Sequence, residues 1–125
     1  MPDMVVDASV IAERVFADSR ADEAALIIRS NNLCAPDLLG YELANVLRTK
    51  VRRQPDQLDL FITALEKALA LPIRLGRVDH VAAARLAVET GLSAYDASYL
   101  LMARDLGAQL ATFDKRLEQA ARGAG

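Results

Sequence analysis

Met4-Val-Val-Asp-Ala-Ser9 is the stretch that decides the fold, because a short apolar run ends directly on an aspartate. A short, uninterrupted apolar run is typical of a buried strand in a parallel sheet. The acid that follows would lie at the carboxyl end of that strand, which is the edge where open α/β sheets bind ligands. Aspartate is also a favoured N-cap for a following helix. The stretch therefore predicts an α/β fold and leaves both roles open for Asp7.

The remainder of the chain repeats the alternation of short apolar runs with helical patterns. We expect strands at Met4 to Val6, Leu33 to Ala35, Ile73 to Leu75 and Gln109 to Thr112. We expect helices at Ser9 to Phe16, Asp18 or Ser19 to Arg29, Pro36 to Arg53 and Pro55 to Ala70, then one capped by Asp79 and ending at Gly91, one capped by Ser93 and ending at Gly107, and a last one to about Ala121. Strands separated by helices predict a parallel sheet of about four strands with helices on both faces, a three-layer α/β/α sandwich.

Length and composition indicate one domain over residues 1–125. With 53% hydrophobic and 26% charged residues, the composition is that of a globular protein. The start of the chain lacks the basic and apolar regions of a signal peptide, so we expect neither secretion nor a membrane span. Cys34 is the single cysteine, which excludes an intrachain disulfide and suits a reducing cytoplasm, and we expect it to be a small buried residue.

The net charge of −2 is unusual for a protein that binds nucleic acid through a broad basic surface. Any such contact must therefore be local. The candidate RNA-binding residues are clustered at the end of one expected helix: Arg48, Lys50, Arg52 and Arg53. A basic run at this place is also typical of a solvated helix terminus that complements the helix dipole, so both interpretations stay open.

Glu42 lies on a helix face that should be apolar. At about 100° per residue it falls within the arc of Leu38, Leu39 and Leu43, which must pack on the core. A buried carboxylate without a partner costs several kcal/mol. Its position therefore calls for a cation, a hydrogen-bond network, an opening to solvent or an arginine partner.

Asp96 interrupts an apolar face in the same way, because it shares that face with Tyr99 and Leu100. Ser93 precedes it by three residues, which is also the spacing of a capping box. Asp114 follows the last expected strand, where it can either lie at the sheet edge or cap the next helix. Each of these acids thus has a structural explanation beside a functional one.

The four acids Asp7, Glu42, Asp96 and Asp114 together predict a metal site. An all-oxygen ligand set suits Mg²⁺ or Mn²⁺, and phosphodiester cleavage is the commonest chemistry of such clusters. Three polar residues near these acids can orient the carboxylates: Ser9, Asn45 and Thr112. Ser9 can equally be a helix-start residue and Thr112 an ordinary strand residue.

Four spaced motifs resemble those of PIN-domain ribonucleases, and more narrowly those of VapC toxins from toxin–antitoxin pairs. They are Met4-Val-Val-Asp-Ala-Ser9, Tyr41-Glu-Leu-Ala-Asn-Val-Leu47, Ser93-Ala-Tyr-Asp-Ala-Ser-Tyr-Leu100 and Ala111-Thr-Phe-Asp-Lys-Arg-Leu117. The resemblance implies that Asp7, Glu42, Asp96 and Asp114 hold Mg²⁺ or Mn²⁺ and are the catalytic residues. It implies cleavage of single-stranded or loop regions of transfer or ribosomal RNA, which would inhibit translation.

The same resemblance implies partners. We expect a homodimer and a VapB-like antitoxin, with DNA bound only indirectly through that antitoxin. The chain stops soon after its last expected helix, where family members commonly continue into another strand, so the presence of that edge strand is left open. With three Phe, three Tyr and no Trp, base-stacking platforms are scarce, and we expect Tyr95 and Tyr99 to be core or rim residues.

Other classes of protein explain fewer of these features. A receiver-like signalling module that binds Mg²⁺ needs a phosphorylatable aspartate at the end of a middle strand, and the strand ending near Leu75-Gly76 offers none. A dehalogenase-like phosphatase needs a second aspartate two residues after Asp7, where the chain has Ser9. A non-catalytic PIN scaffold would be expected to have lost one or more of the four acids.

Overall fold

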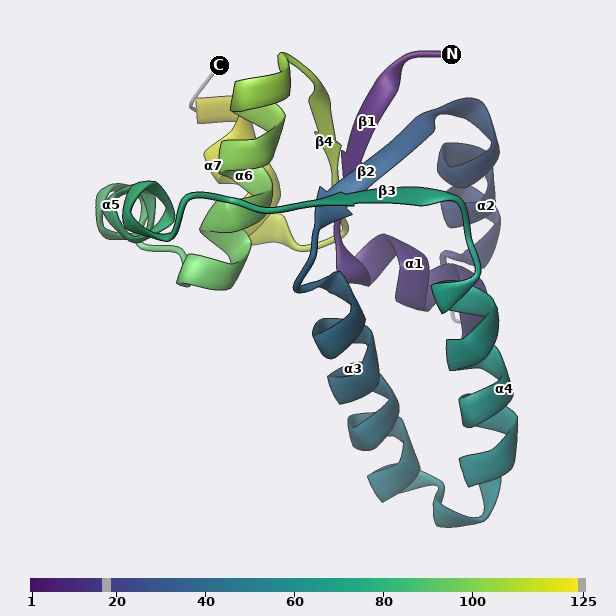
Figure 1. The fold of residues 1–125 in the computed structure, drawn as a ribbon. Coiled ribbons are helices and arrows are strands. Elements are labelled where there is room, and N and C mark those ends of the chain that lie inside the picture. The colour runs from purple at the N-terminus through teal and green to yellow at the C-terminus, as the bar shows by residue number, and fades with distance from the viewer. Residues whose placement is uncertain (17–18, 124–125) are drawn as a thin grey trace.

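Strands and helices alternate along the whole chain in the computed structural model, which describes residues 1–16 and 19–123 (Figure 1). The elements are β1 (Asp3–Val6), α1 (Ala8–Val15), α2 (Ala21–Ser30), β2 (Asn32–Pro36), α3 (Leu39–Arg53), a 3₁₀ turn (Pro55–Gln57), α4 (Leu58–Leu69), β3 (Ile73–Gly76), α5 (His80–Thr90), α6 (Ala94–Leu106), β4 (Gln109–Ala111) and α7 (Lys115–Gly123). Most expected boundaries differ from these by one or two residues, as helix ends commonly do. The alternative start at Asp18 lies outside the described residues.

The four strands form one parallel sheet in the order β3-β2-β1-β4. Val5 of β1 is in register with Cys34 of β2 on one side and with Leu110 of β4 on the other. From β1 the chain proceeds to β2 and β3 in one direction, and β4 is added in the other. The strand order therefore reverses between β1 and β4, which is where open α/β sheets form a ligand crevice beyond the carboxyl ends of the strands.

Helices cover both faces of the sheet, which confirms the predicted three-layer α/β/α sandwich. Figure 1 shows α1 to α4 on one side and α5, α6 and α7 on the other. The pair α3 and α4 projects beyond the carboxyl end of β2, joined at its tip by the 3₁₀ turn. No helix in the described part of the chain is long and apolar enough to cross a membrane.

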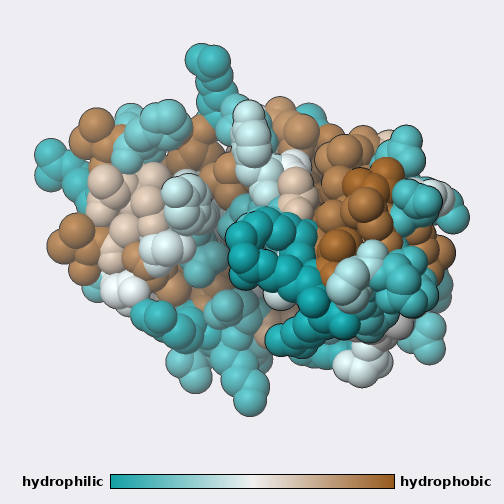
Figure 2. Space-filling view, turned by 90° about the horizontal axis from the view of Figure 1, so that it is seen from below, coloured by the Kyte–Doolittle hydropathy of each residue, from teal (hydrophilic) through white to brown (hydrophobic). Residues whose placement is uncertain are grey.

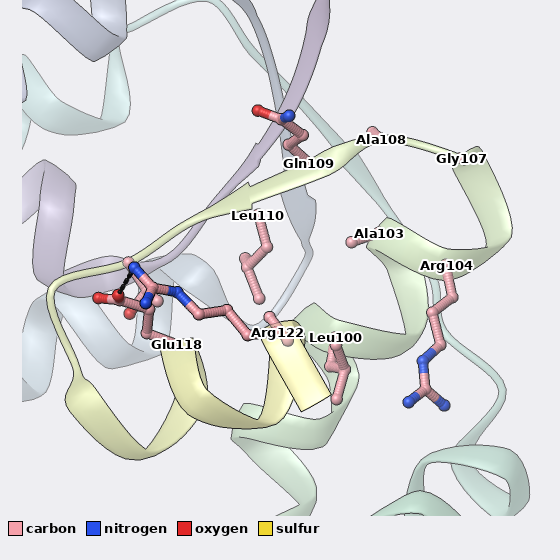
Figure 3. Close-up of a pocket in the computed structure, with 11 residues that line it drawn as sticks. Leu100, Ala103, Arg104, Gly107, Ala108, Gln109, Leu110, Glu118 and Arg122 are labelled. Atoms are coloured by element: carbon pink, nitrogen blue, oxygen red, sulfur yellow. Dashed lines mark ion pairs between the residues drawn. The ribbon is translucent and has the colours of Figure 1, made fainter. Parts of the chain in front are cut away.

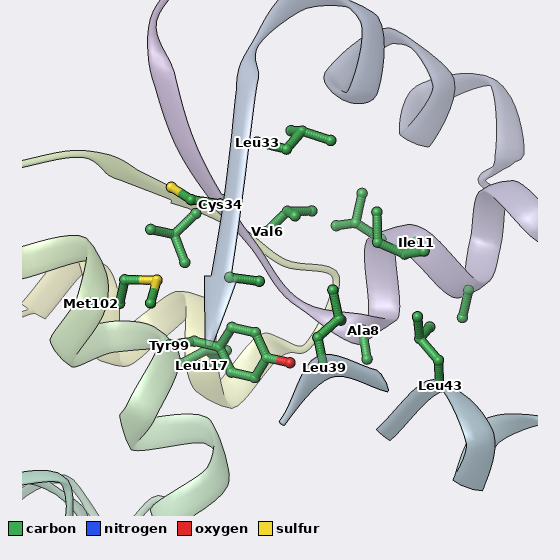
Figure 4. Packing of buried hydrophobic residues seen from close by; sticks show 14 of the residues in the cluster. Val6, Ala8, Ile11, Leu33, Cys34, Leu39, Leu43, Tyr99, Met102 and Leu117 are labelled. Carbon is green, nitrogen blue, oxygen red and sulfur yellow. The ribbon is translucent and has the colours of Figure 1, made fainter. Parts of the chain in front are cut away.

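The core lies on both sides of β1, whose Val5 and Val6 have no exposed surface. Figure 4 shows buried side chains from different helices that belong to this core, among them Ile11 of α1, Leu43 of α3 and Leu117 of α7. Burying a side chain of this size contributes roughly 2 kcal/mol. Packing against the central strand therefore fixes the ends of β1 and β4 relative to the helices that carry the acids.

Pro36 corrects one prediction, because it ends a strand and does not open a helix. It is in register with Gly76 of β3, and the backbone N–H of Asp37 donates to the Gly76 carbonyl at 2.9 Å. The paired residues of β1 and β2 stop at Cys34, so Pro36 lies where a missing strand hydrogen bond costs little. The helix starts only at Leu39. Cys34 itself is buried, as expected.

Candidate active site

Asp7 lies at the junction of β1 and α1, and its side chain is almost fully buried, with 5% exposed. Its Oδ1 accepts hydrogen bonds from the backbone N–H groups of Ser9 at 3.1 Å and Val10 at 3.4 Å, so it caps α1. Oδ1 also accepts the Ser9 hydroxyl at 2.6 Å, and Oδ2 accepts the Thr112 hydroxyl at 2.5 Å. Burial raises the pKa of Asp7, while these hydrogen bonds lower it, and the raising effect is larger.

Two hydroxyl groups connect Asp7 to the chain that leaves β4. The Thr112 hydroxyl accepts the backbone N–H of Asp114 at 3.0 Å, and the Ser9 hydroxyl accepts that of Phe113 at 2.9 Å. Each hydroxyl thus donates to the Asp7 carboxylate and accepts from the backbone after β4. This arrangement fixes the orientation of the carboxylate and joins the ends of β1 and β4.

Glu42 lies in the first turn of α3 and is half-buried. The buried Tyr99 of α6 donates its hydroxyl to Glu42 Oε1 at 2.5 Å, so the partner is a phenol and not an arginine. Burial raises the pKa of Glu42; the Tyr99 hydrogen bond lowers it, and the charges of Asp96 and Asp7 raise it further. The sequence signal for this pair was a tyrosine on a buried helix face, because a buried phenol needs an acceptor.

Asp96 lies in the first turn of α6, and its backbone N–H donates to the Ser93 hydroxyl at 3.1 Å. Its carboxylate forms no return hydrogen bond to the Ser93 N–H among the described residues, so only half of the capping box is present. Burial raises the pKa of Asp96, and the charge of Asp114 raises it further, against a lowering by Ser93 and Arg116. The Asp96 carboxylate thus interacts with the Ser93 side chain and not with the Ser93 backbone, and it forms no ion pair among the described residues.

Asp114 caps α7, because its Oδ1 accepts the backbone N–H of Leu117 at 3.0 Å. Its side chain is exposed. It lies close enough to Asp96 for its negative charge to raise the pKa of that acid. Asp114 thus combines a capping role with a place at the acidic edge of the sheet.

The four acids therefore act on one another although they come from four separate segments of the chain. Asp7 and Asp96 each raise the pKa of Glu42, and Asp114 raises that of Asp96. None of the four forms an ion pair with lysine or arginine in the described part of the structure. Negative charges that raise one another's pKa, without a direct ion pair to lysine or arginine, make a site that a cation would stabilise.

The donor set fits a hard divalent cation chemically, since every candidate ligand atom is a carboxylate oxygen. Within the described ranges, no three His, Cys, Asp or Glu side chains lie close enough together to enclose an ion. The hydrogen bonds explain this spacing in part, because Asp7 is held by its hydroxyl donors and Asp114 by the start of α7. A closed set of ligands would need some of these side chains to turn.

A cavity of about 570 Å³ adjoins Glu42, and Asn45 is one of its lining residues. The others are Ala8, Leu38, Tyr41, Glu42, Val46 and Tyr95. Asn45 is exposed, and no hydrogen bond joins it to Glu42 among the described residues. Asn45 therefore faces the space beside Glu42 and does not orient that carboxylate in this arrangement.

The basic cluster lies at the far end of α3. Arg48, Arg52 and Arg53 are exposed, whereas Lys50 is half-buried with its ammonium 5.7 Å from the ring centre of Phe16. Arg53 is eleven residues beyond Glu42, or roughly 16 Å along the helix axis. Figure 2 looks onto the projecting end of α3 and α4 and shows hydrophilic side chains nearest the viewer, beside a hydrophobic area over α4.

A larger cavity, of about 730 Å³, lies elsewhere, between α6, β4 and α7 (Figure 3). Leu100 and Leu110 line it, together with the ion pair between Arg122 and Glu118 at 2.6 Å. Its lining includes Thr112 but none of the four acids. The candidate site is therefore defined by the four acids, which act on one another's pKa, and not by the size of a cavity.

Comparison with known proteins shows the family to which the chain belongs. Residues 4–123 match the PIN domain family. Over 121 residues the chain is 31% identical to Ribonuclease VapC3 of Pyrobaculum aerophilum, and the alignment covers 93% of this chain and 92% of that protein.

Two solved structures have a similar fold. A crystal structure of PAE2754 from Pyrobaculum aerophilum superposes with a TM-score of 0.81 at 27% identity, covering 98% of this chain and 87% of the other. VapC20 of Mycobacterium tuberculosis, described as a toxin that cleaves the sarcin–ricin loop, superposes with a TM-score of 0.67 and covers 94% of both chains. At 19% identity the second likeness concerns the fold alone. The match over residues 4–123 and the 31% identity over nearly the whole chain show that this protein belongs to the PIN-domain family and is related to the VapC ribonucleases.

Proposed function

We propose that this protein is a divalent-metal-dependent endoribonuclease and the toxin of a type II toxin–antitoxin pair. The observation that carries the proposal is the grouping of Asp7, Glu42, Asp96 and Asp114 at the β1–β4 edge, where they act on one another's pKa and form no ion pair with lysine or arginine in the described part of the chain. The relationship to Ribonuclease VapC3 supports the same conclusion.

In this proposal the four acids hold Mg²⁺ or Mn²⁺ and the neighbouring hydroxyl groups keep the acids in place. Ser9 and Thr112 fix the Asp7 carboxylate, and Tyr99 holds one oxygen of Glu42. A divalent ion held by these residues would supply an activated water and would stabilise negative charge on the leaving oxygen of a phosphodiester. Asp96 and Asp114 complete the negative field that attracts such an ion.

The proposed substrate is RNA in single-stranded or loop regions of transfer or ribosomal RNA, so that cleavage inhibits translation in the cytoplasm. The proposed partners are a VapB-like antitoxin and a second copy of this chain, with DNA bound only through the antitoxin. The membership of the PIN-domain family removes the receiver-like alternative. A non-catalytic PIN scaffold stays as the competing explanation.

The deciding experiment is incubation of total cellular RNA with the purified chain in Mg²⁺ or Mn²⁺, followed by sequencing of new RNA ends. EDTA and the Asp96→Asn variant are the paired controls. We expect discrete cuts that need both the metal and Asp96. Absence of cleavage by folded, antitoxin-free protein with either metal, across transfer and ribosomal RNA, would favour the scaffold.

A further inference from the structure

Two tyrosines on different helices are strongly exposed at the cavity of about 570 Å³. Tyr41 of α3 is 83% exposed and Tyr95 of α6 is 65% exposed, and both line this cavity. Each immediately precedes one of the candidate acids, Glu42 or Asp96. Tyrosine usually buries much of its ring, so two exposed rings at one cavity differ from the singly scattered apolar residues of an ordinary surface.

The other lining residues make the cavity suitable for a planar ring with polar edges. Ala8, Leu38 and Val46 supply apolar surface, and the Asn45 amide supplies both a donor and an acceptor. The volume lies in the range of small-molecule sites, which take up mainly apolar groups and fix them with a few polar ones. A nucleobase has this chemistry, because its faces are apolar and its edges form hydrogen bonds.

The surface that continues from the cavity along α3 carries basic groups that suit the phosphates of a nucleic-acid backbone. Tyr41, Asn45, Arg48 and Arg52 are spaced by four, three and four residues, so they lie on one helix face, and all four are exposed. Over roughly 16 Å this face carries an aromatic ring, an amide and then two guanidinium groups. Single-strand binding sites combine aromatic rings for the bases with basic groups for the phosphates.

We infer that Tyr41 and Tyr95 form a base-stacking site for an unpaired nucleotide of single-stranded RNA, and that the RNA backbone continues along α3 over Arg48 and Arg52. The inference rests on the proposed ribonuclease function and specifies how its substrate is held. It places an unpaired base beside Glu42 and thereby selects single-stranded over duplex RNA. The arginines favour an anionic occupant over an apolar protein segment, and the two exposed rings beside them favour RNA over an acidic one.

Binding can be measured apart from cleavage by working in EDTA. The probes are a mixed-sequence single-stranded RNA of about 12 nucleotides, within the range of known single-strand sites, and the duplex of the same sequence. The chain has no tryptophan, and Tyr99 is buried and bonded to Glu42, so intrinsic tyrosine fluorescence reports mainly on Tyr41 and Tyr95. We expect single-stranded RNA to quench this fluorescence and the duplex to bind more weakly.

Single substitutions test whether the aromatic rings themselves bind the RNA. Tyr41→Ala and Tyr95→Ala should each weaken binding roughly 5- to 100-fold, and Tyr41→Phe and Tyr95→Phe should bind within about threefold of the unaltered protein. Val88→Ala is the matched control, because Val88 of α5 is 86% exposed and does not line the cavity. Circular dichroism melting curves verify that each variant folds.

Salt dependence tests the path along α3. Arg48→Gln should reduce the slope of log affinity against log salt by about one, since it removes one phosphate contact, and Tyr41→Ala should leave that slope unchanged. An unaltered slope in both Arg48→Gln and Arg52→Gln would overturn the proposed path of the backbone.

The inference is wrong if the unaltered chain does not bind single-stranded RNA, or if both alanine variants bind it as well as the unaltered chain does. The second result would assign the two rings to a protein contact. Cleavage with Mg²⁺ or Mn²⁺ is measured in parallel, so the two proposals fail separately. Ring-dependent binding without cleavage supports the stacking site and refutes the nuclease. Cleavage with a KM that does not respond to either alanine substitution supports the nuclease and refutes the stacking site.

Discussion

Asp7 combines a structural and a proposed catalytic role in one carboxylate. It caps α1 and also accepts the hydroxyl groups of Ser9 and Thr112. Asparagine is a good N-cap, but its NH₂ group would face one of these hydroxyl donors. An Asp7→Asn variant would therefore alter the hydrogen bonds and the charge together, and substitutions at neighbouring positions separate the two effects better.

Thr112→Val removes the hydroxyl that bonds Asp7 and nearly preserves the shape of the side chain. It leaves Asp7 Oδ2 without its donor and the Asp114 N–H without its acceptor. We expect the free energy of unfolding to fall by about 1–3 kcal/mol and RNA cleavage to fall roughly 10- to 100-fold. Urea denaturation and initial cleavage rates measure the two quantities.

Thr63→Val provides the matched control for that prediction. Thr63 is exposed on α4, and among the described residues its hydroxyl bonds only the carbonyl of Asp59. We expect a change within about 0.5 kcal/mol and full activity. Equal effects of the two substitutions would show that Thr112 has no special role in holding Asp7.

Asp96→Asn should abolish cleavage and change the pH dependence of stability. The pKa of Asp96 is raised in the folded state, by burial and by Asp114. Folding therefore favours the protonated form of Asp96. The stability that this protonation contributes is fully present below the ordinary pKa of about 4. It is lost as pH rises through the raised pKa of the folded state. In EDTA we expect the variant to match the unaltered protein at acid pH and to be more stable at neutral pH.

Denaturation at a series of pH values measures this difference directly. Asp105→Asn, on the exposed end of α6, is the control and should give a smaller, flatter difference. A variant that is less stable than the unaltered protein at neutral pH would show that the Asp96 carboxylate stabilises the metal-free fold.

At the scale of helices and strands, two glycines give opposite predictions. Gly107 ends α6 with φ of 62°, in the left-handed region, so Gly107→Ala should destabilise by about 1 kcal/mol. Gly40 lies in the first turn of α3, and an added Cβ would be 3.8 Å from a Leu69 methyl, an ordinary contact. Gly40→Ala should therefore stabilise by roughly 0.4–1 kcal/mol. Thermal denaturation measures the change in stability of both variants. If both were stabilised, or both destabilised, the helix-end geometry would be contradicted.

At the scale of the whole molecule, the site depends on β1, β4, α3 and α6 being packed together, so a metal bound there should stabilise the whole fold. Millimolar Mg²⁺ or Mn²⁺ should raise the Tm by several degrees relative to KCl of equal ionic strength. The rise should be smaller for Asp96→Asn, which lacks one proposed ligand. Differential scanning calorimetry measures it, and an equal rise in both proteins would place the ion elsewhere.

The sequence alone determined much of this protein because several of its signals are local. The apolar run ending at Asp7, the serine cap of α6 and the glycines after α5 and α6 each specify a neighbouring element within a few residues. The placement of Glu42 and Asp96 on apolar helix faces, a matter of helical period, also singled them out. The parallel three-layer fold followed from the order of these elements.

Only the tertiary structure decided which side chains meet. The bonds from Tyr99 to Glu42 and from Thr112 to Asp7 join positions 57 and 105 residues apart. Helical period states which face a residue occupies but not the partner that packing brings to it. For the same reason Pro36 was misassigned, because its pairing with β3 depends on a strand distant in sequence. Tyr41 and Tyr95 share a cavity only because packing on the sheet brings the starts of α3 and α6 together beside β1.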